Sequence, residues 1–130
     1  MLDTSTVIRL AEIEDPSSLP KRSLISAVTL AELSVGPLVA DDDEERAARQ
    51  GHLQQAETDF RVLPFDEECA RAFGEVAAAL RAAGRKPAAR AYDALIAASA
   101  IAYRLPLHTC NPDDFKGIPR LDLRPVSVSS

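Results

Sequence analysis

The chain has 130 residues, 46% of them hydrophobic, and a formal net charge of −5. A chain of this length forms one domain with a real core, and its acidic balance excludes a protein that grips nucleic acid by overall positive charge. No apolar run approaches the ~18 residues of a membrane span and no charged-then-apolar leader opens the chain, so we expect a soluble, cytoplasmic protein.

Short apolar runs alternate with longer helical patterns, which is typical of strands joined by crossover helices. Met1 and Leu2 predict the end of a first strand, and because strands are normally longer, we expect the original chain to begin a few residues upstream. A helix follows to about Ile13, and two prolines mark residues 14–22 as a loop. Further strands are predicted at 23–26, 60–64, 105–109 and 121–126, and further helices at 27–35, 44–57, 66–83 and 90–104.

The segment from Arg90 to Arg104 has the pattern of a buried helix, because apolar residues occupy nearly every helical face. Asp93 is the single charge between these two arginines. An ionised acid in such surroundings needs a charged partner, a metal or a proton, and the helix dipole offsets only ~0.3–1 kcal/mol of its burial cost. An ion pair with Arg90, three residues earlier, is the structural alternative.

Four acids stand where predicted elements meet: Asp3, Glu32, Asp93 and Asp114. In a parallel α/β sheet the carboxyl ends of the strands share one edge, where ligand sites gather, so these acids can converge. Convergent carboxylates need a cation. Oxygen ligands without a cysteine pair or a histidine cluster favour Mg²⁺ or Mn²⁺, and such an ion activates water for attack on a phosphodiester. Cys69 and Cys110 are expected to be free thiols.

The other three acids also have structural interpretations. Asp114, like its neighbour Asp113, precedes an aromatic residue and fits the cap of a short turn. Asp3 fits the N-cap of the first helix. Glu32 lies three residues after Thr29, which is the spacing of a capping box. The acidic block at 41–45 is explained by a solvated loop and a first helical turn, and we assign it no metal.

Four segments in this order together resemble the PIN domain of VapC-type toxins: 2–5 (LDTS), 29–33 (TLAEL) followed by Gly36, 93–98 (DALIAA) and 109–115 (TCNPDDF). Each motif alone is weak, but the ordered set is specific and spans almost the whole chain. The resemblance implies a single PIN domain over residues 1–130, an α/β/α sandwich with a mainly parallel central sheet. It also implies the toxin of a type II toxin–antitoxin system, a Mg²⁺- or Mn²⁺-dependent endoribonuclease blocked by a VapB-type antitoxin.

The resemblance makes Asp3 and Asp93 the principal metal ligands and adds Glu32 and Asp114 to complete the acidic quartet. Asp113 competes for the fourth place, and Asp114 is preferred because it directly precedes a phenylalanine, as in the family. Candidates to orient these carboxylates, with turn and cap chemistry as the alternative, are Thr4, Ser5, Thr109 and Asn111. The sequence departs from the family in its short first strand and in Cys110, where a basic residue is frequent.

A basic connector, Arg85, Lys86 and Arg90, precedes Asp93 and either grips the RNA backbone or is simply solvated. The apolar stripe over 28–39 fits an amphipathic antitoxin helix, and an antitoxin arginine would neutralise the acids. We expect a homodimer or a toxin–antitoxin hetero-oligomer and no membrane partner. His52, on a polar helix face, and His108, in a strand, are not expected to be catalysts.

Two other functions stay open. A non-catalytic PIN-like module would hold a partner protein and use its acids structurally. A phosphatase with Asp3 as nucleophile is less favoured, because it would want an aspartate where Ser5 stands.

Overall fold

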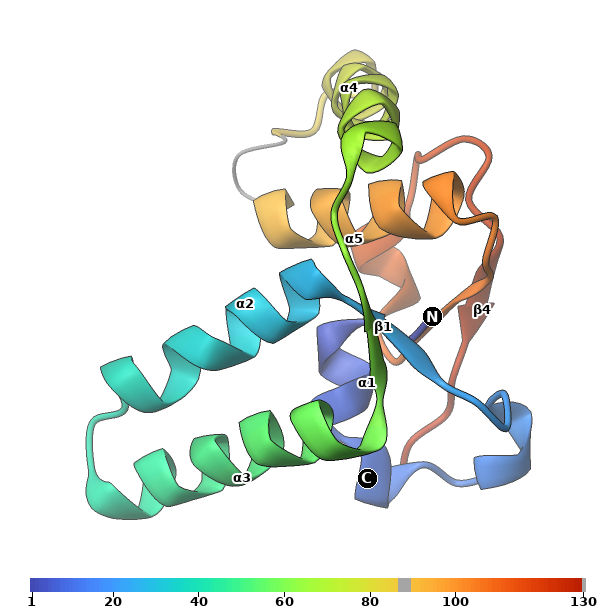
Figure 1. Cartoon of the computed structure of the whole chain (residues 1–130). Coiled ribbons are helices and arrows are strands. Elements are labelled where there is room, and N and C mark those ends of the chain that lie inside the picture. Colours follow the sequence, from blue (N-terminus) through green and yellow to red (C-terminus); the bar gives the residue numbers. More distant parts are fainter. Residues whose placement is uncertain (87–89, 130) are drawn as a thin grey trace.

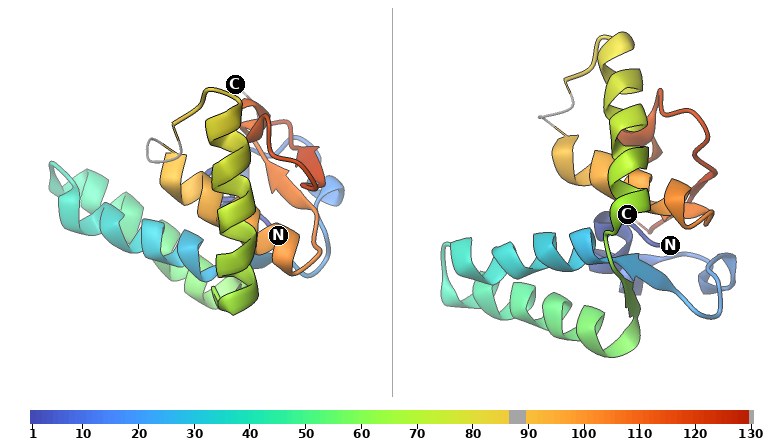
Figure 2. Two further views of the ribbon diagram at one scale, coloured as in Figure 1. Left: turned by 90° about the horizontal axis from the view of Figure 1, so that it is seen from above. Right: turned by 45° about the horizontal axis from the view of Figure 1, so that its top comes forward.

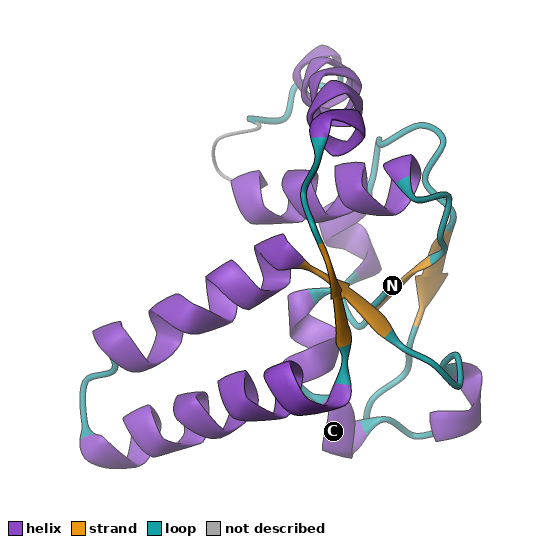
Figure 3. Cartoon of the chain, in the orientation of Figure 1, coloured by secondary structure: helices purple, strands orange, loops and turns teal. Residues whose placement is uncertain are grey.

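The computed structural model, which describes residues 1–86 and 90–129, is built around short strands, most of them parallel (Figure 3). Strand β1 (Leu24–Ser26) pairs in parallel with β2 (Arg61–Leu63), and β3 (Leu107–Thr109) pairs in parallel with β4 (Leu123–Pro125). Each strand lies inside a segment predicted to be one.

The N-terminal residues join these two pairs into one layer. The Leu2 N–H donates to the carbonyl of Leu24 over 2.9 Å, and the His108 N–H donates to the carbonyl of Met1 over 2.9 Å. Leu2 also forms a parallel bridge with His108. The spatial order is therefore β2, β1, residues 1–3, β3, β4. The predicted first strand is present as this bridge alone, because Asp3 already caps the helix that follows.

Within the described residues, α-helices surround this layer: α1 (Thr4–Ile8), α2 (Ala27–Val35), α3 (Asp43–Asp59), α4 (Glu67–Ala82) and α5 (Ala91–Ala102). Single 3₁₀ turns are η1 (Leu10–Glu12), η2 (Pro16–Ser18), η3 (Gly36–Val39) and η5 (Pro112–Phe115). The predicted extent of the first helix is wrong, since α1 ends at Ile8 and a 3₁₀ turn replaces the rest. Asp66 is the N-cap of α4, because its side chain accepts the N–H of Cys69 at 3.1 Å.

The sheet is buried on both faces, as the alternation of side chains along a strand requires. Leu2 and Ile25 face one core, which they share with residues of α1, α2 and α3: Val7, Leu33 and Ala56. Met1, Leu63 and Leu107 face a second core, which they share with residues of α2, α5 and η5: Val28, Ile96, Ala97, Ala100 and Phe115. Helices thus cover both sides of a mainly parallel sheet, and the predicted α/β/α class is confirmed.

The helices form two groups (Figure 1). α2 and α3 run side by side as an arm that projects from the sheet, and both views of Figure 2 keep them together. On the other side α4 crosses over α5, and a third apolar cluster lies between them: Ala72, Val76, Leu80, Ala94 and Ala98. The prediction of a buried central helix is confirmed by α5.

Gly84, just beyond the end of α4, adopts a φ of +77°, a left-handed conformation that favours glycine. The basic connector that follows falls partly outside the described residues, because 87–89 are not among them. No helix in the described part of the chain has both the length and the apolar character needed to cross a membrane.

Candidate functional site

Asp3 is a buried carboxylate surrounded by hydroxyl donors. Its main-chain N–H donates to the carbonyl of His108 over 3.2 Å, which places it at the carboxyl end of β3. Oδ1 accepts the N–H of Thr6 at 3.1 Å and the Thr6 hydroxyl at 2.6 Å. Oδ2 accepts the Thr109 hydroxyl at 2.7 Å, and the Ser5 hydroxyl contacts both oxygens at 3.0 and 2.9 Å. Asp3 is therefore the N-cap of α1, and its orientation is also held from β3.

Thr6 is a site residue that the sequence prediction missed. Its hydroxyl lies between the two strand ends, donating to Asp3 and accepting the N–H of Cys110 at 3.2 Å. The available signal was its position three residues after an N-cap, where a side chain turns back towards the capping carboxylate. Asn111, which was predicted, donates its main-chain N–H to the Thr109 hydroxyl at 3.0 Å.

Glu32 faces the same region from α2. The Thr4 hydroxyl donates to Glu32 Oε1 over 2.7 Å and lies 3.2 Å from the Thr29 hydroxyl. The capping-box explanation of Glu32 is wrong, because α2 begins at Ala27 and its N-cap is Ser26, whose side chain accepts the N–H of Val28. Thr29 lies inside the helix and is buried.

Asp93 and Asp114 meet around one guanidinium. The side chain of Asp93, in the first turn of α5, is 28% exposed, and that of Asp114, in η5, is 33% exposed. Nη1 of Arg90 pairs with Asp114 and lies 3.9 Å from Oδ2 of Asp93. Asp113 is 81% exposed and pairs with Lys116 at 3.0 Å. Of the two neighbouring acids, Asp114 is therefore the one that faces Asp93.

The charges of the other three acids act on Asp93. Burial of Asp93, followed by the negative charges of Asp114, Asp3 and Glu32, raises its pKa from 3.8 to about 6, although Arg90 opposes the change. These acids come from the start of α1, from α2, from α5 and from η5. The structure thus brings together all four acids that the sequence singled out, while their roles stay predictions.

A divalent cation fits this donor set in chemistry and charge. Among residues 1–86 and 90–129, no three acidic, histidine or cysteine side chains are positioned together so that they could hold an ion. Each carboxylate faces a protein donor instead: hydroxyls for Asp3 and Glu32, and Arg90 for Asp93 and Asp114. The donors are nevertheless all oxygen, as hard cations prefer, and a cation would offset the negative charges that, together with burial, raise the pKa of Asp93.

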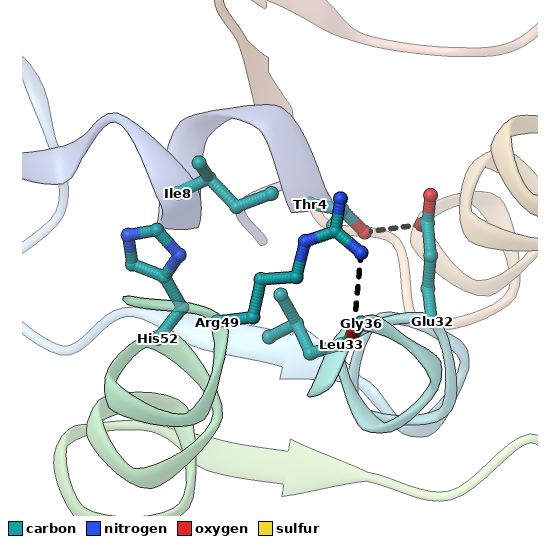
Figure 4. A pocket seen from close by; sticks show the side chains of 7 residues that line it. All are labelled: Thr4, Ile8, Glu32, Leu33, Gly36, Arg49 and His52. Carbon is teal, nitrogen blue, oxygen red and sulfur yellow. Dashed lines mark hydrogen bonds between the residues drawn. The ribbon is translucent and has the colours of Figure 1, made fainter. Parts of the chain in front are cut away.

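A pocket of about 250 Å³ opens beside Glu32, between α1, α2 and α3 (Figure 4). Its lining residues are Thr4, Ile8, Glu32, Leu33, Gly36, Arg49 and His52. Nη1 of Arg49 donates to the carbonyl of Gly36 at 2.9 Å, which ties α3 to the end of α2. His52, expected on a polar face, is half-buried and turned into this pocket.

Comparison with known proteins agrees with this fold. The family model described as PIN domain matches residues 1–121, and the chain belongs to the PIN domain family. Within that family the similarity is to VapC ribonucleases. "Ribonuclease VapC5" of Mycobacterium tuberculosis is 36% identical, covering 91% of this chain and 86% of the relative. "Ribonuclease VapC" of Rickettsia bellii is 30% identical, covering 98% and 96%.

Solved structures give the same result. The crystal structure of VapBC-5, a toxin–antitoxin system of M. tuberculosis, superposes with a TM-score of 0.81 at 36% identity and covers 96% of each chain. The DNA-bound VapBC of Salmonella typhimurium gives a TM-score of 0.72 at 26% identity, again over 96% of each chain. The resemblance to VapC-type PIN domains, drawn from four short motifs, is confirmed.

Proposed function

We propose that this protein is the toxin of a type II toxin–antitoxin system, an endoribonuclease that hydrolyses RNA phosphodiester bonds with a divalent metal, Mg²⁺ or Mn²⁺. The observation that carries the proposal is the convergence of Asp3, Glu32, Asp93 and Asp114. Burial, followed by the charges of the other three acids, raises the pKa of Asp93. The names of the relatives support the proposal, since they are ribonucleases of the VapC type.

In this proposal Asp3 and Asp93 hold the metal, and Glu32 and Asp114 complete the site directly or through water. When bound, the ion supplies an activated water and stabilises charge on the phosphoryl group. Asp3 is already oriented by hydroxyls from α1 and β3, so it pays little entropy to act as a ligand. A carboxylate of the quartet takes the proton from water, and the products carry a 5′ phosphate and a 3′ hydroxyl.

The expected partner is a VapB-type antitoxin, since the structural neighbours are VapBC complexes and one of those cited above is bound to DNA. An apolar surface for it lies at the end of α2 and on η3, where Val35, Leu38 and Val39 are exposed. Gly36, which directly follows Val35 in the chain, lines the pocket beside Glu32. An amphipathic antitoxin helix on this surface would bring its side chains within reach of the acids.

The proposal is tested by incubating purified protein with total RNA in Mg²⁺, in Mn²⁺ and in EDTA, with Asp93→Asn as the control. We expect cleavage that needs the metal, is lost in the variant, and leaves 5′ phosphate ends. Cleavage that persists in EDTA, or 2′,3′-cyclic phosphate ends, would rule out metal-activated water. Tight antitoxin binding without any RNA cleavage would instead favour the non-catalytic partner-binding module.

A further inference from the structure

Arg90 places one positive charge between two acids from different parts of the chain. It directly precedes α5 as its N-cap residue, and Nη1 pairs with Asp114 in η5. The same nitrogen lies 3.9 Å from Oδ2 of Asp93 in α5. The guanidinium therefore bridges α5 and η5 as a bound cation would.

The neighbouring cations of this surface have a different task. Arg85 donates to the main-chain carbonyls of Asp113, at 3.3 Å, and of Lys116, so it holds the backbone of η5 in place. Lys116 pairs with the exposed Asp113. Arg90 is the cation of this group that contacts the acids facing the site. Its side chain is 44% exposed, which leaves it room to swing outward.

We propose that Arg90 is a built-in counter-ion that competes with the divalent metal for Asp93 and Asp114. This inference rests on the proposed metal site. A metal that binds the same carboxylates must displace the guanidinium from them. The displaced guanidinium then lies at the mouth of the site, where the RNA backbone would pass. Arg90 thus screens the acids in the metal-free protein and becomes available to a phosphate once the metal is bound.

If Arg90 competes with the metal, removing its charge should raise the affinity for Mn²⁺, whereas removing a residue that helps to bind the metal would lower it. Removing the charge of Arg90 frees two carboxylates, so Mn²⁺ should bind more tightly. A single exposed ion pair is weak, but here one guanidinium serves two carboxylates. We therefore expect Arg90→Gln to bind Mn²⁺ roughly three- to tenfold more tightly than wild type. Arg90→Lys keeps the charge and should stay within about twofold of wild type.

Arg71→Gln is the matched control. Arg71 on α4 also bridges two carboxylates, Glu67 at 3.8 Å and Glu68, and its loss changes the net charge by the same amount. Full-length wild type and the three variants are titrated with Mn²⁺ by calorimetry, and their melting temperatures are recorded in EDTA and in saturating Mn²⁺. Arg90→Gln should melt lower than wild type in EDTA and recover in Mn²⁺, whereas Arg71→Gln should differ from wild type equally in both.

The Mn²⁺ affinities of these variants decide whether Arg90 competes with the metal. Equal Mn²⁺ affinity in wild type and Arg90→Gln, or equal tightening by Arg90→Gln and Arg71→Gln, overturns specific competition. Weaker binding by Arg90→Gln would make Arg90 a residue that positions Asp114 for the metal. If these results came with metal-dependent RNA cleavage, the proposed function would stand without the competition. If none of the proteins bound Mn²⁺, the proposed metal site and this inference would fail together.

Discussion

The hydroxyl of Thr109 donates to Oδ2 of Asp3 over 2.7 Å, although the two residues are 106 positions apart in the chain. Both are buried where the N-terminal residues pair with β3. The bond couples the packing of the sheet to the orientation of a proposed metal ligand. Asp3 therefore has its direction set by the fold before any ion arrives.

Replacing Thr109 with valine removes this donor and keeps the side-chain shape. A hydrogen bond to a charged group is worth ~1.5–3 kcal/mol, but Asp3 keeps the donors of Ser5 and Thr6. We expect Thr109→Val to lower the free energy of unfolding by about 1–2 kcal/mol, measured by urea denaturation in EDTA. Thr109→Ser retains the hydroxyl and should lose less than half of that. Equal losses in both variants would show that packing, not the hydrogen bond, is responsible.

Asp93 should destabilise the metal-free protein at neutral pH, because its carboxylate is ionised against burial and three neighbouring acids. Asp93→Asn removes that charge. We expect its melting temperature in EDTA to exceed that of wild type by about 3–6 °C, the shift that ~1 kcal/mol produces in a domain of this size. The rise on adding Mg²⁺ or Mn²⁺ should be lost. Asp113→Asn, at the exposed neighbouring acid, should behave as wild type in both conditions. If Asp93→Asn melted below wild type in EDTA, the charge of Asp93 would not be destabilising in the metal-free protein.

The raised pKa of Asp93 also sets a pH dependence. Because the folded-state pKa of about 6 lies above the ordinary value of 3.8, the folded protein holds more protons on this group than the unfolded chain does between those values. The stability that comes from this group is therefore complete below about pH 4 and is lost as pH rises through 6. The difference in melting temperature between Asp93→Asn and metal-free wild type should grow over this range and level off above pH 7. A constant difference across pH 4–8 would argue for an ordinary pKa.

Protons should compete with the metal in the same range. Below pH 6 Asp93 becomes protonated and cannot ligate a cation, so Mn²⁺ affinity should fall by up to about tenfold per pH unit. Calorimetric titration at pH 5, 6 and 7 measures this directly. Arg90→Gln removes the one charge that lowers the pKa of Asp93, so its loss of affinity should begin at a higher pH. An affinity that is flat between pH 5 and 7 would exclude Asp93 as a ligand.

Local patterns predicted the positions of the elements well. The segments 23–26, 60–64, 105–109 and 121–126 each contain a strand, although every strand has three residues. Apolar character extends past the paired residues, because flanking side chains such as Leu105 and Phe65 also pack on the core. The overlong first helix has the same origin, since the apolar Leu10 and Ile13 continue the pattern after hydrogen bonding has become 3₁₀.

Long-range relationships in the site were harder to predict. The parallel topology was enough to predict that the acids converge. The pairing of Arg90 with Asp114 depends instead on how η5 is positioned relative to α5, which the sequence pattern does not show. The sequence suggested Arg90 as a partner for Asp93 through helical spacing alone. Likewise, His52 enters the pocket because α3 packs against α1 and α2, which the polarity of its own helix does not reveal.

A substitution on the apolar surface at the end of α2 tests partner binding while leaving the four acids unchanged. Leu38 is 85% exposed, so the fold gains little from its side chain, yet it stands beside Val35 and Val39 on a surface suited to an amphipathic helix. We expect Leu38→Asp to weaken binding of the cognate antitoxin by at least about tenfold, since a charge in an apolar contact must be desolvated. RNA cleavage and the melting temperature of the free toxin should be unchanged. Arg81→Asp, an exposed change on α4, should bind the antitoxin as wild type does. If Leu38→Asp kept full antitoxin affinity, the partner would have to dock elsewhere.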